Sequence, residues 1–173
     1  MHLKLLTMTK TSGIYLLILL IFFVIGFYAF GVYLIALDPS GNEAGLETRK
    51  LMELTSLKSY YIPAFLVSIF GVIFPLFTSM CLMSRPNIKW PKSMNIYENY
   101  QWDYAFALYT AYSFLILSAF HVLLREGNSM FPTLVILASS IMIILLNNPQ
   151  NQKYFIKKAK KSRSTTERGA VSA

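Results

Sequence analysis

Four long apolar stretches, none of which contains Lys, Arg, Asp or Glu, constrain the fold of this chain more than any other feature. They cover residues 14–37, 60–83, 104–124 and 130–146. A helix needs about 20 residues, at about 1.5 Å each, to cross the roughly 30 Å hydrocarbon core of a bilayer. A segment in lipid must satisfy its own backbone, and no stretch alternates like a barrel strand, so we expect four helices. The sequence predicts an all-α integral membrane protein, a transmembrane four-helix bundle.

The composition argues against most catalytic chemistry. Of the 173 residues, 55% are apolar and 14% are charged, and the mean hydropathy is +0.48, which disfavours a soluble enzyme. One cysteine allows no internal disulfide, and Cys81, His2 and His121 lack the spacing of zinc ligands. The sequence also lacks a Ser-His-Asp arrangement, a glycine-rich phosphate loop and paired intramembrane carboxylates. We therefore expect a non-enzymatic protein without a metal or a cofactor.

Five segments flank and connect the predicted spans. They are the N-terminal segment 1–13, the loops 38–59, 84–103 and 125–129, and the C-terminal tail 147–173. From the first loop into the start of the second span, apolar residues recur at helical spacing at Leu51, Leu54, Leu57 and Tyr61. This pattern predicts an amphipathic helix that extends the second span beyond the bilayer. The third loop allows only a tight turn, so the last two spans should form an antiparallel hairpin.

The second loop, residues 84–103, is rich in proline and aromatic residues. Trp and Tyr favour the membrane–water interface because their rings are apolar while their polar groups can reach water. The predicted interface anchors are Trp90, Trp102, Tyr97 and Tyr100. We expect this loop to lie along the interface and to anchor both flanking helices.

The distribution of positive charge predicts the orientation, because short cytoplasmic loops are enriched in Lys and Arg. Residues 1–13 carry two such residues, the second loop three and the tail seven, whereas the first and third loops carry three and one. Both termini are therefore predicted to be cytoplasmic. A single cysteine and the lack of an Asn-x-Ser/Thr acceptor site are compatible with a multi-pass protein of the bacterial inner membrane.

Small residues gather on one side of two spans. In the second span they are Ala64, Ser68, Gly71, Pro75 and Ser79, and in the third they are Ala107, Ala111 and Ser118. Small residues let helices in a membrane approach closely, so both rows are predicted to be helix-packing or oligomerisation faces. The alternative is that the row of the second span lines a pore or a substrate path. Pro75 also predicts a kink, which would free the carbonyl of Gly71.

Ionisable side chains are nearly absent from the spans, which weakens any proton-transfer hypothesis. Asp103 and His121 project from the same side of the third span, but about 27 Å of helix separates them, so they cannot form a catalytic pair. Asp103 is expected to begin the helix. We interpret His121 as a hydrogen-bonded interfacial imidazole, with a pH-sensitive group as the alternative.

Basic side chains crowd the tail, after an Asn-Asn-Pro sequence at 147–149 that is predicted to interrupt the last helix. The predicted contact residues are Lys153, Lys157, Lys158, Lys160, Lys161 and Arg163. At an anionic membrane surface each contributes on the order of 1 kcal/mol. The sharper hypothesis is a docking segment for an acidic cytosolic protein, with direct nucleic-acid binding ranked below it.

Three functional hypotheses follow. The first is a sensor or scaffold subunit that forms a homo-oligomer, with a tetramer as the first guess, and that recruits or regulates a cytosolic effector. The alternative is an oligomeric channel or small-solute carrier whose path is lined by the small residues of the second span. A membrane enzyme ranks last, because the spans offer neither acid–base pairs nor metal ligands.

The outline of Lys4 and Lys10 before the first span, four spans, a tight turn at 125–129 and a basic tail from Lys153 resembles the small four-span membrane subunit of the Kiwa anti-phage system. The resemblance covers the whole chain in plan. It implies an inner-membrane oligomer that detects phage infection at the envelope and works with a cytosolic, DNA-binding partner. It assigns no functional residue, and it favours the first hypothesis over the second.

Overall fold

The computed structural model describes residues 2–44, 46–84, 95–97, 100–124 and 130–156, without the side chains of residues 2–11. Every regular element in this part of the chain is helical. Four helical stretches are long and apolar enough to cross a membrane, namely Ser12–Leu37, Tyr61–Ser84, Trp102–Leu124 and Met130–Asn147. The prediction of an all-α protein with four spans is confirmed, and the cytoplasmic placement of both termini stays a prediction.

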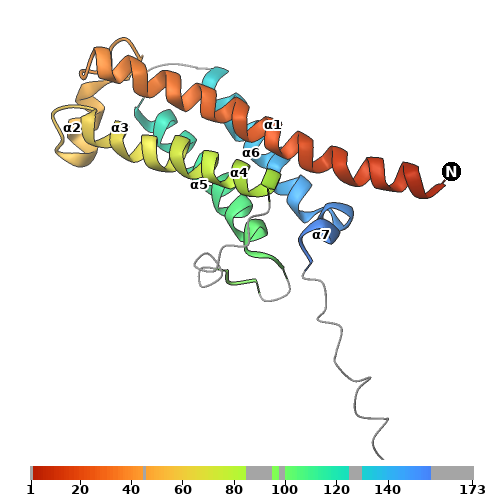
Figure 1. Ribbon diagram of the computed structural model, residues 1–173. Coiled ribbons are helices and arrows are strands. Elements are labelled where there is room, and N and C mark those ends of the chain that lie inside the picture. The colour runs from red at the N-terminus through yellow and green to blue at the C-terminus, as the bar shows by residue number, and fades with distance from the viewer. Residues whose placement is uncertain (1, 45, 85–94, 98–99, 125–129, 157–173) are drawn as a thin grey trace, which may run out of the picture.

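The four spans lie side by side in one bundle (Figure 1). α1 (His2–Leu37) contacts the second span and α6 (Met130–Asn147), and its N-terminal turns extend beyond the other helices. α5 (Trp102–Leu124) packs most extensively against α6, as expected for a hairpin, although the turn 125–129 itself lies outside the described residues. The short helices α2 (Thr48–Thr55) and α7 (Pro149–Phe155) lie at opposite ends of the bundle.

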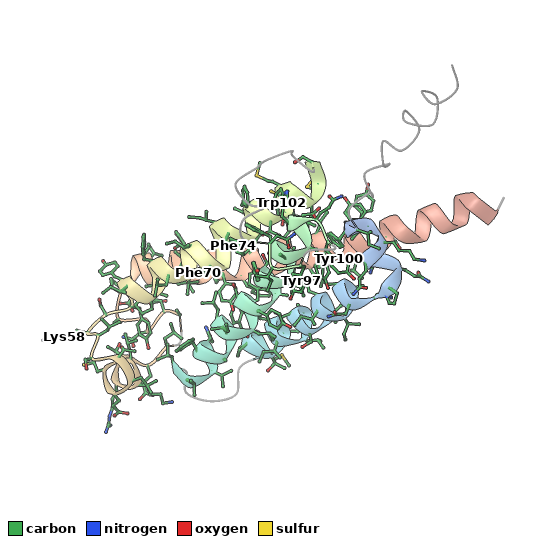
Figure 2. The ribbon with its side chains drawn as sticks, turned by 90° about the horizontal axis from the view of Figure 1, so that it is seen from below. Lys58, Phe70, Phe74, Tyr97, Tyr100 and Trp102 are labelled. Carbon is green, nitrogen blue, oxygen red and sulfur yellow. The ribbon has the colours of Figure 1, made fainter. Side chains whose placement is uncertain are left out.

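The core of the bundle is built from one stripe of each span. Ile21 and Val24 of α1, Phe114 of α5 and Met142 of α6 are fully buried. Outside this core, apolar side chains point away from the bundle over most of its surface (Figure 2). Only 28–39% of the most apolar window of each span is buried. An apolar exterior of this extent suits hydrocarbon rather than water as the surrounding medium.

The second span consists of three consecutive helical segments rather than one uniform α-helix. They are α3 (Tyr61–Val67), the π-helical segment η1 (Ser68–Ile73) and α4 (Phe74–Ser84). The amide of Phe74 donates to the carbonyl of Ile69, five residues earlier. The next residue, Pro75, has no amide hydrogen for a regular helical bond, and a wider turn beside it accommodates this gap. The irregularity predicted at Pro75 therefore takes the form of a π-helical segment.

Two boundaries differ from the expectation. α1 begins at His2, so residues 2–13 continue the first span as a helix instead of forming a separate segment. The amphipathic helix of the first loop is also separate from the second span, and the predicted extension is wrong. Ser56 adopts a left-handed conformation (φ 58°) and its amide bonds the carbonyl of Met52, which ends α2 before the chain turns into α3.

Candidate functional site

The row of small residues on the second span lies inside the protomer. Ala64, Gly71, Pro75 and Ser79 are buried, and Ser68 is half-buried. A Cβ atom at Gly71 would lie 3.0 Å from Cγ of Tyr28 on α1 and 3.2 Å from Cδ1 of Leu117 on α5. The hydroxyls of Ser68 and Ser79 donate to carbonyls of their own helix, at 2.8 and 3.0 Å. The row therefore lets three helices approach one another within a single protomer.

The matching row on α5 is also buried, at Ala107, Ala111 and Ser118. A hydrogen bond that the sequence did not reveal links this helix to α4: the hydroxyl of Thr110 donates to that of Thr78 at 3.0 Å, and both residues are buried. The sequence shows that the spans contain serine and threonine, which can form hydrogen bonds between helices. Which of them pair depends on how each helix is rotated about its axis. This packing does not support a pore or substrate path along the small residues of the second span. The channel hypothesis stays a prediction.

At the end of the last span, α7 folds back against α1 and α6. Asn148 caps α7, because its side chain accepts a bond from the amide of Gln150 at 2.9 Å and Pro149 starts the first turn. The buried side chain of Asn151 donates to the carbonyl of Leu145 at 2.8 Å. The same side chain fills the space where a Cβ of Gly13 on α1 would lie. The predicted interruption at 147–149 thus leads into a docked helix.

The residues that begin α5 hold the other side of α7. The amide of Gln101 donates to the carbonyl of Phe155 at 2.7 Å, and Tyr100 forms an antiparallel bridge with Ile156. The ring of Phe155 is fully buried, 5.3 Å from that of Tyr104. We call α7 together with residues 100–104 the tail platform. Ile156 follows the platform and is the last described residue, and the run of basic residues from Lys157 comes directly after it in the sequence.

Three of the four predicted interface anchors belong to this region (Figure 2). Trp102 is buried and its ring stacks on that of Phe77, with 6.4 Å between the ring centroids. The half-buried rings of Tyr97 and Tyr100 contact Tyr104, at 5.4 and 4.5 Å. These side chains pack on the bundle, and their anchoring role at the interface stays a prediction. Trp90 lies outside the described residues.

The predicted basic contact residues fall mostly beyond the tail platform. Lys153 is exposed on the last turn of α7. The others, Lys157, Lys158, Lys160, Lys161 and Arg163, lie outside the described residues.

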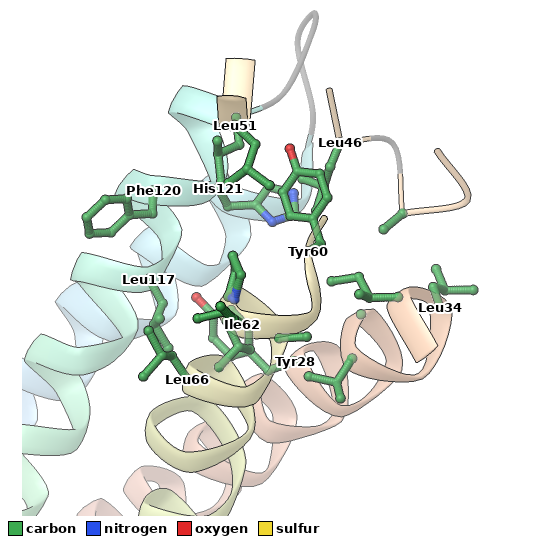
Figure 3. Close-up of a pocket in the computed structure, with 18 of the residues that line it drawn as sticks. Tyr28, Leu34, Leu46, Leu51, Tyr60, Ile62, Leu66, Leu117, Phe120 and His121 are labelled. Carbon is green, nitrogen blue, oxygen red and sulfur yellow. The ribbon is translucent and has the colours of Figure 1, made fainter. Parts of the chain in front are cut away.

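The two ionisable residues of α5 lie at its opposite ends. Asp103 is buried in the first turn, where its carboxylate accepts a bond from the amide of Tyr104 at 3.0 Å. The ring of His121 lies 5.0 Å from that of Phe131 and faces a cavity of about 620 Å³ beneath α2 (Figure 3). This separation excludes a catalytic pair, as the sequence indicated.

The first loop forms a cap over the end of the bundle opposite to the tail platform. We call residues 38–44 and 46–60 the α2 cap. The amide of Glu47 donates to the carbonyl of Leu124 at 3.0 Å, which ties the cap to the end of α5. Tyr60, fully buried, donates from its hydroxyl to the carbonyl of Glu47 at 2.8 Å. Gly41 is at a φ of 83° with the Tyr60 ring against it, so this turn requires glycine.

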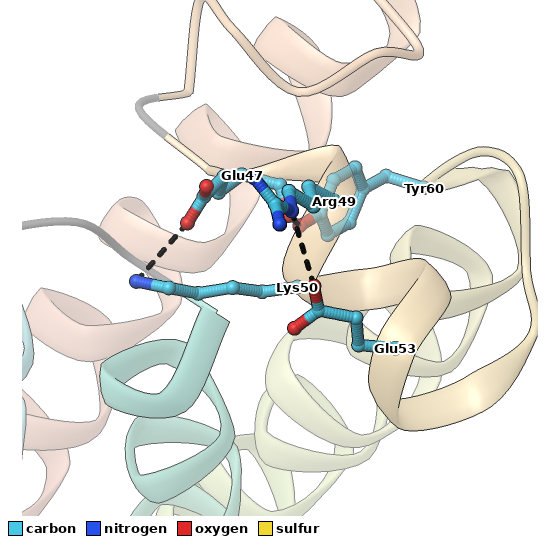
Figure 4. A network of polar contacts seen from close by, with 5 residues as sticks. All are labelled: Glu47, Arg49, Lys50, Glu53 and Tyr60. Atoms are coloured by element: carbon cyan, nitrogen blue, oxygen red, sulfur yellow. Dashed lines mark hydrogen bonds and ion pairs between the residues drawn. The ribbon is translucent and has the colours of Figure 1, made fainter.

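The α2 cap carries two ion pairs, one exposed and one partly buried (Figure 4). Arg49 pairs with Glu53 at 3.1 Å (Nε to Oε1), and Lys50 pairs with Glu47 at 3.1 Å (Nζ to Oε2). Burial, together with the nearby Glu47 carboxylate, raises the pKa of Tyr60 to about 12. Hydrogen bonds from the side chain and amide of Ser40 hold the pKa of Asp38 below its ordinary value.

Within the described residues, no group of three or more His, Cys, Asp or Glu side chains is placed to hold a metal ion. No family model, no curated protein and no solved structure matches this chain. The candidate sites are therefore identified from the structure alone. They are the tail platform at one end of the bundle and the α2 cap with its cavity at the other end.

Proposed function

We propose that this protein is a membrane sensor and scaffold subunit that presents its basic tail to a cytosolic effector protein. The observation that carries the proposal is the contact of the tail platform with all four spans. α7 meets α1 at Gly13 and α6 at the carbonyl of Leu145. The hydroxyl of Tyr154 donates to the carbonyl of Leu82 at the end of the second span, at 3.1 Å, and Phe155 packs on Tyr104 of α5.

This arrangement couples the position of the tail to the packing of the whole bundle. A shift of any span relative to its neighbours changes a contact of α7, and the run of basic residues begins in the sequence directly after Ile156. The α2 cap is linked to the same spans at the other end, through the bond from Glu47 to Leu124. We therefore assign sensing to the spans and the α2 cap, and effector binding to the tail.

The charge of the tail defines the partner. Lys153 and the basic residues from Lys157 to Arg168 favour an acidic protein surface, and they also favour anionic lipid headgroups while no effector is bound. The proposed location is the bacterial inner membrane with both termini in the cytoplasm, and the proposed state is a homo-oligomer. The Kiwa resemblance supplies the proposed setting, defence against phage, with a DNA-binding protein as the effector.

The test is affinity purification of the tagged full-length protein in mild detergent, followed by mass measurement of the intact complex. Lys160→Gln/Lys161→Gln should lose a cytosolic protein that the wild type retains. The matched control is Arg49→Gln/Lys58→Gln, which removes two exposed positive charges from the α2 cap and should retain the partner. Equal retention by both double variants would reject the tail as the docking segment.

A second measurement separates effector binding from lipid binding. Vesicles of phosphatidylglycerol should bind a peptide of residues 149–173 more strongly than vesicles of phosphatidylcholine, because the tail is cationic. If the tail binds these vesicles but the purified complex contains no tail-dependent protein, the scaffold proposal is wrong and the tail is a lipid-binding segment. In cells, deletion of residues 157–173 should abolish any protection against phage without lowering the amount of inserted protein.

A further inference from the structure

The proposed function makes no use of the cavity beneath the α2 cap. Its volume of about 620 Å³ lies within the range of roughly 300–1,000 Å³ that is typical of small-molecule sites. α1 forms its floor, α3 and α5 form its walls, and the α2 cap covers it (Figure 3). Ile62 and Leu66 project from one wall, and Leu117 and Phe120 from the other.

The course of the second span opens this space. α5 packs against η1 and α4 but has no extensive contact with α3, so α3 and α5 separate from the π-helical segment toward the α2 cap. On the floor, Gly31 contributes no side chain. Among the described residues, nothing lies within 4 Å of the position that a Cβ of Gly31 would take. The cavity therefore lies where α3 and α5 do not pack closely on each other, with Gly31 on its floor.

The chemistry of the walls selects an uncharged, apolar occupant. Four polar side chains interrupt an otherwise apolar lining. The hydroxyls of Tyr28, Thr55 and Tyr60 already donate to the carbonyls of Phe114, Leu51 and Glu47, and the fourth is the imidazole of His121 at one edge. A polar solute would lose its hydration in such a site without replacement. An apolar cavity also holds water poorly.

The cavity is bordered by residues that are also exposed on the outer surface of two spans. Its edges carry Ile62 and Leu66 from α3 and Ile116 and Phe120 from α5, with 47–58% of each residue's surface exposed. These residues belong to membrane spans, so the medium at these edges is hydrocarbon.

We propose that this cavity binds one acyl chain of a phospholipid from the surrounding leaflet. The chain enters between α3 and α5, lies on α1 at Gly31 and ends beneath Leu51 of the α2 cap. This inference is independent of the tail and of effector binding.

The test uses the full-length protein in vesicles of phosphatidylethanolamine and phosphatidylglycerol, followed by transfer to detergent and native mass spectrometry. The wild type should retain one phospholipid per protomer. Gly31→Phe places a ring in the cavity and should lose it. Gly26→Phe is the matched control, because Gly26 lies on the same helix, is exposed, and also has open space around its Cβ position in the described structure.

Three outcomes would overturn the proposal: a wild type that retains no phospholipid, one that retains only a free fatty acid or detergent, or equal retention by the two variants. Loss of a second copy in Gly31→Phe without loss of lipid would also overturn it and assign the cavity to self-association.

A second measurement needs no variant, and so holds even if Gly31→Phe fails to fold. A phospholipid with a photoactivatable diazirine at the end of one acyl chain is added to the vesicles before irradiation. Labelling should reach Ile35 and Leu51, which line the cavity but are buried from bulk lipid. Val24 and Met142 are equally buried away from the cavity and should stay unlabelled. Equal labelling of the two pairs, or none at Ile35 and Leu51, would reject the proposal.

Discussion

At the scale of single residues, glycine has opposite roles at different positions of the same bundle. Gly71 is enclosed by Tyr28 and Leu117, whereas the surroundings of Gly26 and Gly31 are open within the described structure. The sequence identified Gly71 as a packing residue from its neighbours in a small-residue row. It could not identify the partners, because they depend on the rotation of α1 and α5 about their axes.

Gly71→Val should destabilise the bundle, because the added side chain overlaps Tyr28 and Leu117. Overpacking of a tight core costs about 1–3 kcal/mol. Thermal unfolding in detergent, followed by circular dichroism, measures the change, and Gly26→Val serves as the control. Equal unfolding temperatures for the two variants would contradict the tight contact at Gly71.

We expect the α2 cap to become less stable at high pH, because the pKa of Tyr60 is raised in the folded protein. Its pKa rises from 10.0 to about 12 in the folded protein, so the folded state keeps a proton that the unfolded state releases above pH 10. The stabilisation is fully present below pH 10 and is lost as the pH rises toward 12. The phenolate absorbance of the wild type minus that of Tyr60→Phe should show a late titration. A difference curve centred near pH 10 would show that Tyr60 is exposed to solvent.

At the scale of elements, length and hydropathy were sufficient for the four spans, because a bilayer imposes the same requirement on any helix that crosses it. The irregular elements were harder to predict from the sequence. Pro75 indicated a disturbance, but the choice between a kink and the π-helical segment Ser68–Ile73 depends on packing against α1 and α5. α2 was predicted as part of the second span because helical spacing continues through Leu57, and the left-handed Ser56 that ends it has no sequence signal of its own.

The docking of α7 was likewise hidden, since Gly13 and Asn151 are far apart in the sequence. Gly13→Leu should displace α7, because the side chain of Asn151 occupies the space that the leucine needs. We expect faster cleavage by trypsin after Lys153 than in the wild type, with Gly26→Leu as the control. Unchanged cleavage in Gly13→Leu would mean that α7 is not held against α1.

At the scale of the whole molecule, the proposed function requires the α2 cap and the tail to lie on opposite sides of the membrane. In a Cys81→Ser background, a cysteine at Asn42 should react with an impermeant maleimide in intact cells. A cysteine at Ser172 should react only after the membrane is permeabilised. Labelling of both positions from the same side would refute the predicted orientation and, with it, effector recruitment.

The tail platform also has a consequence for biogenesis. α7 is synthesised after all four spans, and its binding surface is made by residues from every span before it, from Gly13 to Leu145. The surface is complete only after the last span has entered the bilayer and joined the others. A copy that stalls during insertion, or that leaves one span outside the bundle, exposes Phe155 instead of burying it. The docked position of α7 is therefore restricted to copies in which all four spans have packed together.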